Sequence, residues 1–281
     1  MKVKIVTDST ADLPSNVCDE LGIDVVPLNV HFGEQVLKDG QDVSAEEFYH
    51  RLVSSPSLPT TSQPSVGAFA EVYSQLLEGC DSIISIHISS KLSGTCNSAI
   101  QARKELEADD RIHVIDALTS SLGLGLVAKR AAELANQSAE VGTIVETVCA
   151  AAARTEVFGL LETLEYLQKG GRIGKAQAFV GSLLNIKPIL TVRDGVVHPL
   201  ERARTRAKGI ERLKSIVADR APLDDLAVMF STTEEEAYGL AKNIAPYLDQ
   251  GSVTIGQFGP VLGTHLGPGA LGVALIRSKI G

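Results

Sequence analysis

The chain has 281 residues, of which 44% are hydrophobic and 21% charged, a composition typical of a globular protein with one large domain or two modest ones. A formal net charge of −8 argues against nucleic acid as a partner, and no apolar run approaches the roughly 20 residues that a membrane-spanning helix needs. The first residues turn polar too early for a secretory signal, so we expect a cytoplasmic protein.

The first half of the chain alternates β-rich runs with amphipathic stretches. Apolar runs at 3–8, 82–88 and 112–117 predict buried strands, and the segments 66–79 and 97–109 have the spacing of helices. A strand–helix–strand order indicates parallel βαβ units, which place ligand-binding loops at the carboxyl ends of their strands.

The second half has a different pattern. Asp194-Gly195 lies between two apolar runs in 188–200 and predicts a β-hairpin, which belongs to an antiparallel or mixed sheet. Further helices are expected over 162–171, 175–187, 207–219 and 234–248, and further strands over 226–232 and 252–258. We therefore predict two α/β domains, residues 1–155 and 156–281, with a cleft between them.

Two loops that precede predicted helices are rich in hydroxyl groups. In SSKLSGT (89–95), Ser93, Gly94 and Thr95 are suited to bind a carboxylate or phosphate, because a helix N-terminus presents free N–H groups. In PTTSQPS (59–65), Thr61 and Ser62 are suited to the same role. The alternative for both loops is a helix cap with nothing bound.

A third hydroxyl-rich strand exit, TDSTADLP (7–14), contains Asp8, for which a ligand, a supporting acceptor and a cap all remain open. Glycine-rich GPVLGTHLGPGALG (259–272) contains a lone His265. Glycines allow the main chain to approach a ligand closely, which favours a binding loop, and the alternative is a structural histidine in a turn.

Basic residues form two further candidates. Arg172 follows a predicted helix end, and Arg202 and Arg204 belong to the basic stretch 201–212. Solvated or ion-paired side chains are the alternative to contacts with an acidic partner or a membrane surface.

Signals for common cofactors are weak. The segment GLGLVA (123–128) matches a relaxed dinucleotide fingerprint but is separated from the preceding strand, and GRIGKA lacks the spacing of a P-loop. No pair of cysteines has CxxC spacing, which disfavours a zinc site.

The segments KIVTDSTADLP, TSQPS, ISSKLSGT, LEYLQKGGRIG, LLNIKPIL and GPVLGTHLGPGALGV occur in this order over almost the whole chain. Together they resemble the DegV family of bacterial fatty-acid-binding proteins. The resemblance implies two α/β domains that bury one long-chain fatty acid between or beneath them. It also implies, for some members, a role as the lipid-carrying subunit of fatty acid kinase, which presents the carboxylate to a separate ATP-binding subunit for acyl-phosphate formation and phospholipid synthesis.

Carried over by position, the resemblance implies that Ser93 and Thr61 hydrogen-bond the carboxylate and that His265 belongs to the same polar network. Arg172 and either Arg202 or Arg204 would lie near the head group and the kinase surface. The implied protein is a carrier without catalysis of its own, and it needs no cofactor besides its fatty acid ligand.

A hydrolase that acts on an acyl ester or an acyl-phosphate is the competing hypothesis, with Ser93 as nucleophile and His265 as base. Against it, the sequence has no G-x-S-x-G elbow and no evident acid to orient the histidine.

Overall fold

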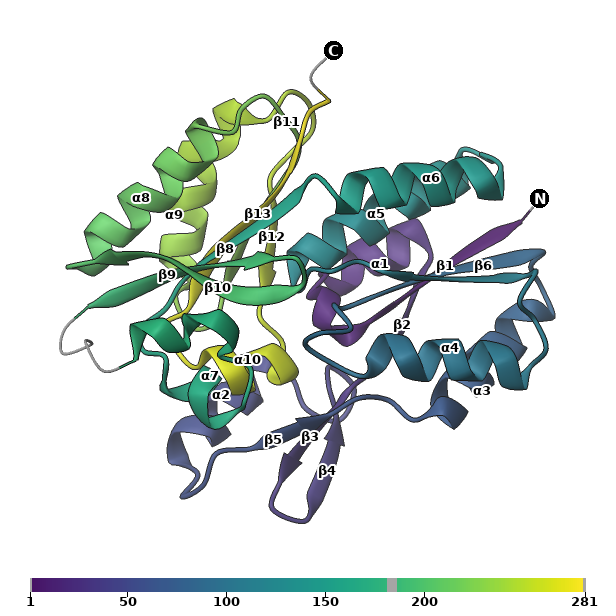
Figure 1. Ribbon diagram of the computed structural model, residues 1–281, viewed down its shortest axis with the longest axis horizontal. Coiled ribbons are helices and arrows are strands. Elements are labelled where there is room, and N and C mark those ends of the chain that lie inside the picture. The colour runs from purple at the N-terminus through teal and green to yellow at the C-terminus, as the bar shows by residue number, and fades with distance from the viewer. Residues whose placement is uncertain (1, 181–185, 280–281) are drawn as a thin grey trace.

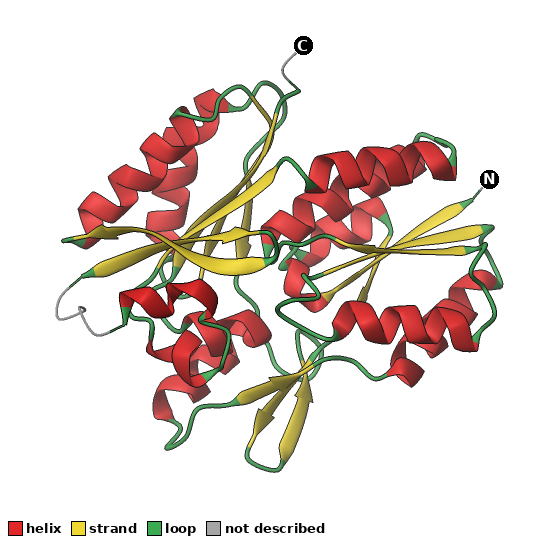
Figure 2. Cartoon of the chain, in the orientation of Figure 1, coloured by secondary structure: helices red, strands yellow, loops and turns green. Residues whose placement is uncertain are grey.

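In the computed structural model, which describes residues 2–180 and 186–279, the first half of the chain forms a parallel sheet (Figures 1 and 2). Its strand order is β2-β1-β6-β7, and all three pairings are parallel, as the strand–helix alternation predicts. The strands are β1 (Val3–Asp8), β2 (Ile23–Val26), β6 (Ser82–His87) and β7 (Ile112–Asp116).

Helices cover both faces of this sheet, because its strands are apolar on both sides. One face packs against α3 and α4, and the opposite face packs against α1 and α5, with α6 lying along α5 (Figure 1). The helices are α1 (Ser15–Leu21), α3 (Val66–Leu77), α4 (Thr95–Glu105), α5 (Leu122–Asn136) and α6 (Val141–Ala152).

A small sheet of order β4-β3-β5 extends from this half and carries α2 (Ala45–Ser54). Its strands are β3 (Asn29–Phe32), β4 (Gln35–Lys38) and β5 (Thr60–Ser62). This unit packs against α10 (Pro260–Leu266), so two segments that lie far apart in the sequence meet here.

The second half forms a six-stranded mixed sheet of order β10-β9-β8-β13-β11-β12, in which only β11 and β12 pair in parallel. The strands are β8 (Thr155–Leu160), β9 (Lys187–Arg193), β10 (Val196–Ala203), β11 (Leu223–Phe230), β12 (Thr254–Gln257) and β13 (Leu271–Arg277). One face packs against α8 (Arg206–Ala218) and α9 (Glu234–Ile244).

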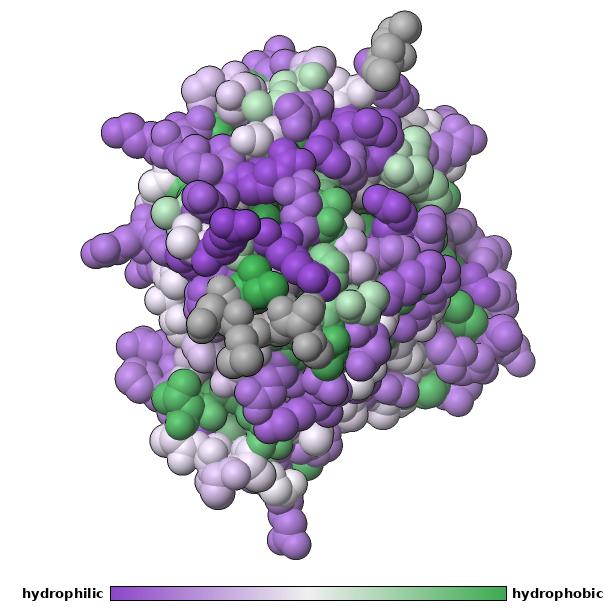
Figure 3. Space-filling view, turned by 60° about the vertical axis from the view of Figure 1, so that its left-hand side comes forward, coloured by the Kyte–Doolittle hydropathy of each residue, from purple (hydrophilic) through white to green (hydrophobic). Residues whose placement is uncertain are grey.

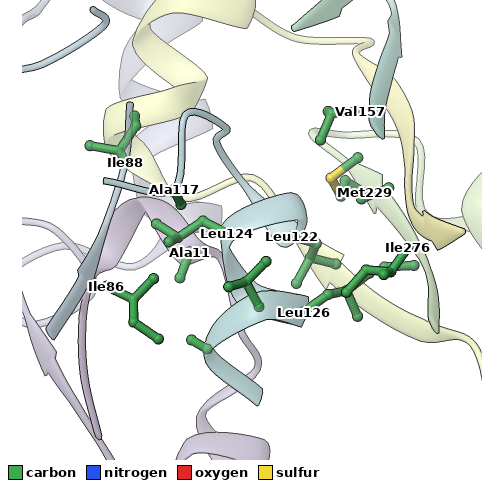
Figure 4. Packing of buried hydrophobic residues seen from close by; sticks show 14 of the residues in the cluster. Ala11, Ile86, Ile88, Ala117, Leu122, Leu124, Leu126, Val157, Met229 and Ile276 are labelled. Atoms are coloured by element: carbon green, nitrogen blue, oxygen red, sulfur yellow. The ribbon is translucent and has the colours of Figure 1, made fainter. Parts of the chain in front are cut away.

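The opposite face of the mixed sheet packs against α5, so one helix contacts both large sheets. Figure 4 shows Leu122, Leu124 and Leu126 of α5 between Ile86 of the parallel sheet and Met229 of the mixed sheet. The two halves therefore share their largest hydrophobic core, and the division at residue 155 stays a prediction.

Most predicted elements are confirmed, and the Asp194-Gly195 hairpin is confirmed by positive φ angles of 50° and 74° at its two central residues. Three expectations were wrong in part. The glycine-rich segment 259–272 is not a loop throughout, because it forms α10 and the start of β13. The helix expected over 162–171 is the short α7 (Glu165–Lys169), and the one expected over 175–187 is a 3-10 helix, Gly174–Phe179, followed by 181–185, which lie outside the described residues.

Within the described residues, no helix combines the length and hydrophobicity needed to cross a bilayer. On the face shown in Figure 3, hydrophilic side chains predominate and apolar residues lie in small separated groups.

Candidate functional site

An apolar cavity lies where the mixed sheet, α10 and the loop after β6 meet. The empty space that its walls outline is about 960 Å³, which includes the open space at its mouth. Its apolar lining residues are Leu28, Ile88, Leu92, Val157, Phe158, Gly159, Leu161, Leu167, Leu190, Val192, Val197, Met229, Phe258, Val261, Leu262 and Leu266. A cavity lined in this way suits a hydrocarbon and offers it few polar partners.

Five predicted site residues line this cavity: Thr61, Ser62, Ser93, Arg172 and His265. They come from four separate parts of the chain, and the Thr61 and His265 side chains meet directly, with 3.0 Å between Thr61 Oγ1 and His265 Nε2. The polar groups that the sequence placed in separate loops therefore share one site.

The loop that carries Ser93 is fixed by its own hydroxyl groups. Thr95 Oγ1 lies 2.8 Å from Ser93 Oγ, and the backbone N–H of Thr95 donates to Ser93 Oγ at 3.3 Å. A Cβ atom on Gly94 would lie 2.7 Å from Gln63 Nε2, so the 93–95 loop touches the segment that follows Thr61. Gly94 and buried Thr95 thus hold Ser93 in place and do not themselves line the cavity.

Ser62 was expected to bind the same ligand as Thr61, but its hydroxyl has other partners. Ser62 Oγ lies 2.8 Å from His31 Nε2 and 3.3 Å from Asn29 Nδ2, within the small sheet. The helix-cap alternative for Thr61 and Ser62 was wrong, because Ser65 caps α3.

His265 lies in the last turn of α10 and is only 7% exposed. Burial, and secondarily the nearby positive charge of Arg172, lower its pKa to about 4, so the imidazole is neutral at physiological pH. Its Nδ1 atom has no hydrogen-bond partner and faces Gly170, where a Cβ would lie 2.3 Å away. A neutral ring therefore contacts Thr61 through one nitrogen only.

Two buried carboxylates, which the sequence analysis missed, anchor the helix that carries His265. The N–H of Gly259 donates to Asp12 Oδ1 at 2.9 Å, and the backbone of Val261 hydrogen-bonds Asp39. Burial raises the pKa of Asp12 well above its usual value and that of Asp39 to about 7. No local pattern marks these residues, since each lies in a short loop far in sequence from α10.

The three predicted partner-contact arginines are exposed, but only Arg172 borders the cavity. Its Nη1 donates to the Gly170 carbonyl at 2.8 Å, and its Nε lies 3.5 Å from the Leu92 carbonyl. Arg202 stacks on the Phe179 ring, with 4.3 Å between the guanidinium carbon and the ring centroid. Arg204 lies between β10 and α8, and neither it nor Arg202 lines the cavity.

A Ser–His–Asp arrangement exists elsewhere in the molecule, but it is inaccessible. His87 Nε2 lies 2.7 Å from Ser85 Oγ, and His87 Nδ1 lies 2.9 Å from Asp8 Oδ2. All three residues have no exposed surface and do not line the cavity, and Asp8 also caps the turn that follows β1. The role of Asp8 is therefore structural.

At the cavity itself, His265 Nδ1 has no carboxylate to orient the ring, and Nε2 contacts Thr61 rather than Ser93. This geometry does not favour the hydrolase hypothesis. Among residues 2–180 and 186–279, no cluster of three or more histidine, cysteine or acidic side chains is arranged to hold a metal ion.

A family model, a relative in sequence and two solved structures that are similar to this chain all belong to one family. A family model described as "Uncharacterised protein, DegV family" matches residues 2–278. A DegV domain-containing protein of Halalkalibacterium halodurans is 40% identical, over 99% of this chain and 99% of its own length. A fatty-acid-binding DegV family protein from Thermus thermophilus superimposes with a TM-score of 0.91 at 35% identity, covering 99% of this chain and 100% of that one. The crystal structure of DegV, a fatty acid binding protein from Bacillus subtilis, has a TM-score of 0.87 at 35% identity, with the same coverage.

Proposed function

This chain belongs to the DegV family, and from that premise we propose that it binds a long-chain fatty acid, with the hydrocarbon in the apolar cavity and the carboxylate at Thr61 and Ser93. One observation carries the proposal: Thr61 on β5, Ser93 in the loop before α4 and the buried His265 border a cavity that is otherwise lined mainly by apolar side chains. The fatty-acid-binding relatives of known structure support the same class of ligand.

The division of polar and apolar groups explains how such a ligand would be held. Each buried methylene contributes about 0.8 kcal/mol, so roughly 15 of them supply on the order of 12 kcal/mol before ordering costs. Each hydrogen bond to a charged carboxylate adds about 1.5–3 kcal/mol. The tail therefore supplies most of the affinity, and the polar end fixes the orientation.

His265 supports Thr61 in this arrangement through its tautomer. A neutral ring protonated on Nε2 donates to Thr61 Oγ1, which leaves the Thr61 proton free to point at the carboxylate. The same tautomer leaves Nδ1 as an acceptor without a proton, which suits its position against Gly170. His265 is thus a positioning residue in the proposed site.

The direct experiment is mass spectrometry of a solvent extract from the protein purified from a bacterial host. We expect a long-chain fatty acid in near-stoichiometric amount. An extract without any acyl species, from protein that also fails to bind added fatty acid, would contradict the proposal.

We further propose that the bound carboxylate is presented to a separate ATP-dependent kinase, which converts it to an acyl-phosphate. The position of exposed Arg172 at the cavity supports a reachable head group, and phosphoryl transfer depends mainly on positioning and charge stabilisation. Arg202 and Arg204 are proposed contacts with the kinase, or with a membrane surface during lipid transfer.

The kinase step is tested with loaded protein, ATP and a purified ATP-binding subunit of a bacterial fatty acid kinase, with acyl-phosphate trapped by hydroxylamine. We expect hydroxamate from the parent protein and much less from Arg172→Ala, with fatty acid binding retained. Absence of hydroxamate with the parent would refute kinase presentation and leave lipid binding standing.

A further inference from the structure

A glycine in the middle of the mixed sheet leaves an open space in the cavity wall. Gly159 lies on β8, a central strand, between β9 and β13. It is partly exposed although Phe158 and Leu160 on either side of it are buried. Because Gly159 lines the cavity, its exposed surface faces the cavity.

The side that Gly159 faces follows from strand alternation. Val157 and Leu161, two positions away in each direction, belong to the core on the α5 side and line the cavity. Phe158 and Leu160 belong to the core beneath α8 and α9. A side chain at position 159 would therefore project into the cavity.

Nothing in the protein itself requires a glycine at this position. The backbone of Gly159 does not have a positive φ angle, and an added Cβ would meet only Leu161 Cδ2, at 4.0 Å. Glycine in a strand interior weakens the strand and often marks close approach of a ligand.

At the neighbouring glycine, Gly272, an added Cβ atom would meet atoms that lie too close. Gly272 pairs with Gly159 across the β8–β13 ladder, but a Cβ there would lie 2.8 Å from the Phe158 carbonyl oxygen and 2.9 Å from Met229 Cε. Gly272 is thus required by packing, with the Met229 side chain lying over it. Of these two paired glycines, only Gly159 has open space around an added Cβ, and Met229 is itself part of the cavity wall.

We propose that Gly159 determines the length of acyl chain that the protein accepts, because the space that it leaves is occupied by the hydrocarbon. The inference rests on the proposed function and assigns this position to the tail, away from the polar groups at Thr61 and Ser93. A larger side chain at position 159 would fill the space and exclude the distal methylenes of a long fatty acid, while the head-group contacts remain.

The test compares delipidated parent, Gly159→Val and Gly159→Leu for displacement of a fluorescent fatty acid by a graded series from decanoic to octadecanoic acid. For Gly159→Leu we expect the affinity for octadecanoic acid to fall roughly tenfold or more, equivalent to about 1.4 kcal/mol or fewer than two buried methylenes. Decanoic acid should change by less than about threefold, and Gly159→Val should be intermediate. Gly142→Leu, at an exposed position on α6 with open space around it, is the matched control and should keep the parent profile.

Thermal unfolding distinguishes a filled space from a damaged fold. Since an added Cβ atom meets nothing closer than Leu161 Cδ2, at 4.0 Å, and the space beyond it belongs to the cavity, Gly159→Val should unfold at or above the parent temperature. An unchanged chain-length profile in a folded variant, or an equal loss at every chain length, would overturn the inference. A parent protein that binds no fatty acid of any length would instead refute the proposed function.

Discussion

The contact between Thr61 and His265 gives the sharpest prediction about the polar end of the cavity. Thr61→Val keeps the shape of the side chain and removes the hydroxyl group that lies 3.0 Å from His265 Nε2. Because Nδ1 of the same buried ring already has no partner, the variant leaves both ring nitrogens unpaired. An unsatisfied buried polar group costs about 1–3 kcal/mol, so the free energy of unfolding of the lipid-free protein should fall by about that amount.

Fatty acid binding should fall as well, and by a separate mechanism. If Thr61 donates to the carboxylate, the loss of one charge-assisted hydrogen bond is worth about 1.5–3 kcal/mol, or about 10-fold to 150-fold in the dissociation constant. Urea unfolding of delipidated protein measures the first effect, and displacement of a fluorescent fatty acid measures the second.

Ser62→Ala is the matched control, since Ser62 neighbours Thr61 but binds His31 and Asn29 within the small sheet. It should lower the free energy of unfolding and leave fatty acid affinity near that of the parent. Parent-like affinity in Thr61→Val, or an equal loss of affinity in Ser62→Ala, would refute the assignment of Thr61 to the head group.

Three further predictions concern His265 and two close-packed glycines. The pKa of His265 is about 4 in the folded protein and about 6.5 when unfolded. The neutral imidazole therefore contributes fully to the free energy of unfolding above about pH 6.5, and this contribution falls by at most about 3 kcal/mol as the pH approaches 4. His265→Gln should remove that part of the pH dependence in urea unfolding, and an unchanged slope would contradict the buried neutral ring. Gly170→Ala would place a Cβ 2.3 Å from His265 Nδ1, so both unfolding temperature and fatty acid affinity should decrease, and a parent-like variant would show that the ring moves freely. Gly272→Ala would place a Cβ 2.8 Å from the Phe158 carbonyl oxygen and should cost about 1–3 kcal/mol in the free energy of unfolding, unlike Gly159→Ala, which should cost nothing.

The polar site could be predicted in part because its residues carry local signals. Hydroxyl groups at strand exits mark Thr61 and Ser93, and a lone histidine among glycines marks His265. The same signals did not show that the Ser62 hydroxyl, although it also borders the cavity, lies within hydrogen-bond distance of His31 and Asn29 in the small sheet.

Helix α10 shows why local propensity failed in one segment. Glycine and proline disfavour a helix in isolation, so 259–272 was expected to be a loop. In the folded chain, Pro260 occupies a favourable first-turn position, and Asp12 and Asp39 accept hydrogen bonds from backbone N–H groups at the start of the helix. Gly263 lies against Phe48 and Tyr49, where a Cβ would be as close as 2.6 Å, so the glycine allows close packing.

By itself, the sequence determined the alternation of strands and helices, the Asp194-Gly195 hairpin and the type of chemistry that its loops offer, because these depend on residues close together in the chain. Only the tertiary structure decided that Thr61 reaches His265, 204 positions away, that α5 joins the two sheets, and that Gly159 opens into a cavity while Gly272 does not. Those outcomes depend on which distant side chains fill the same volume, and no spacing along the chain encodes that.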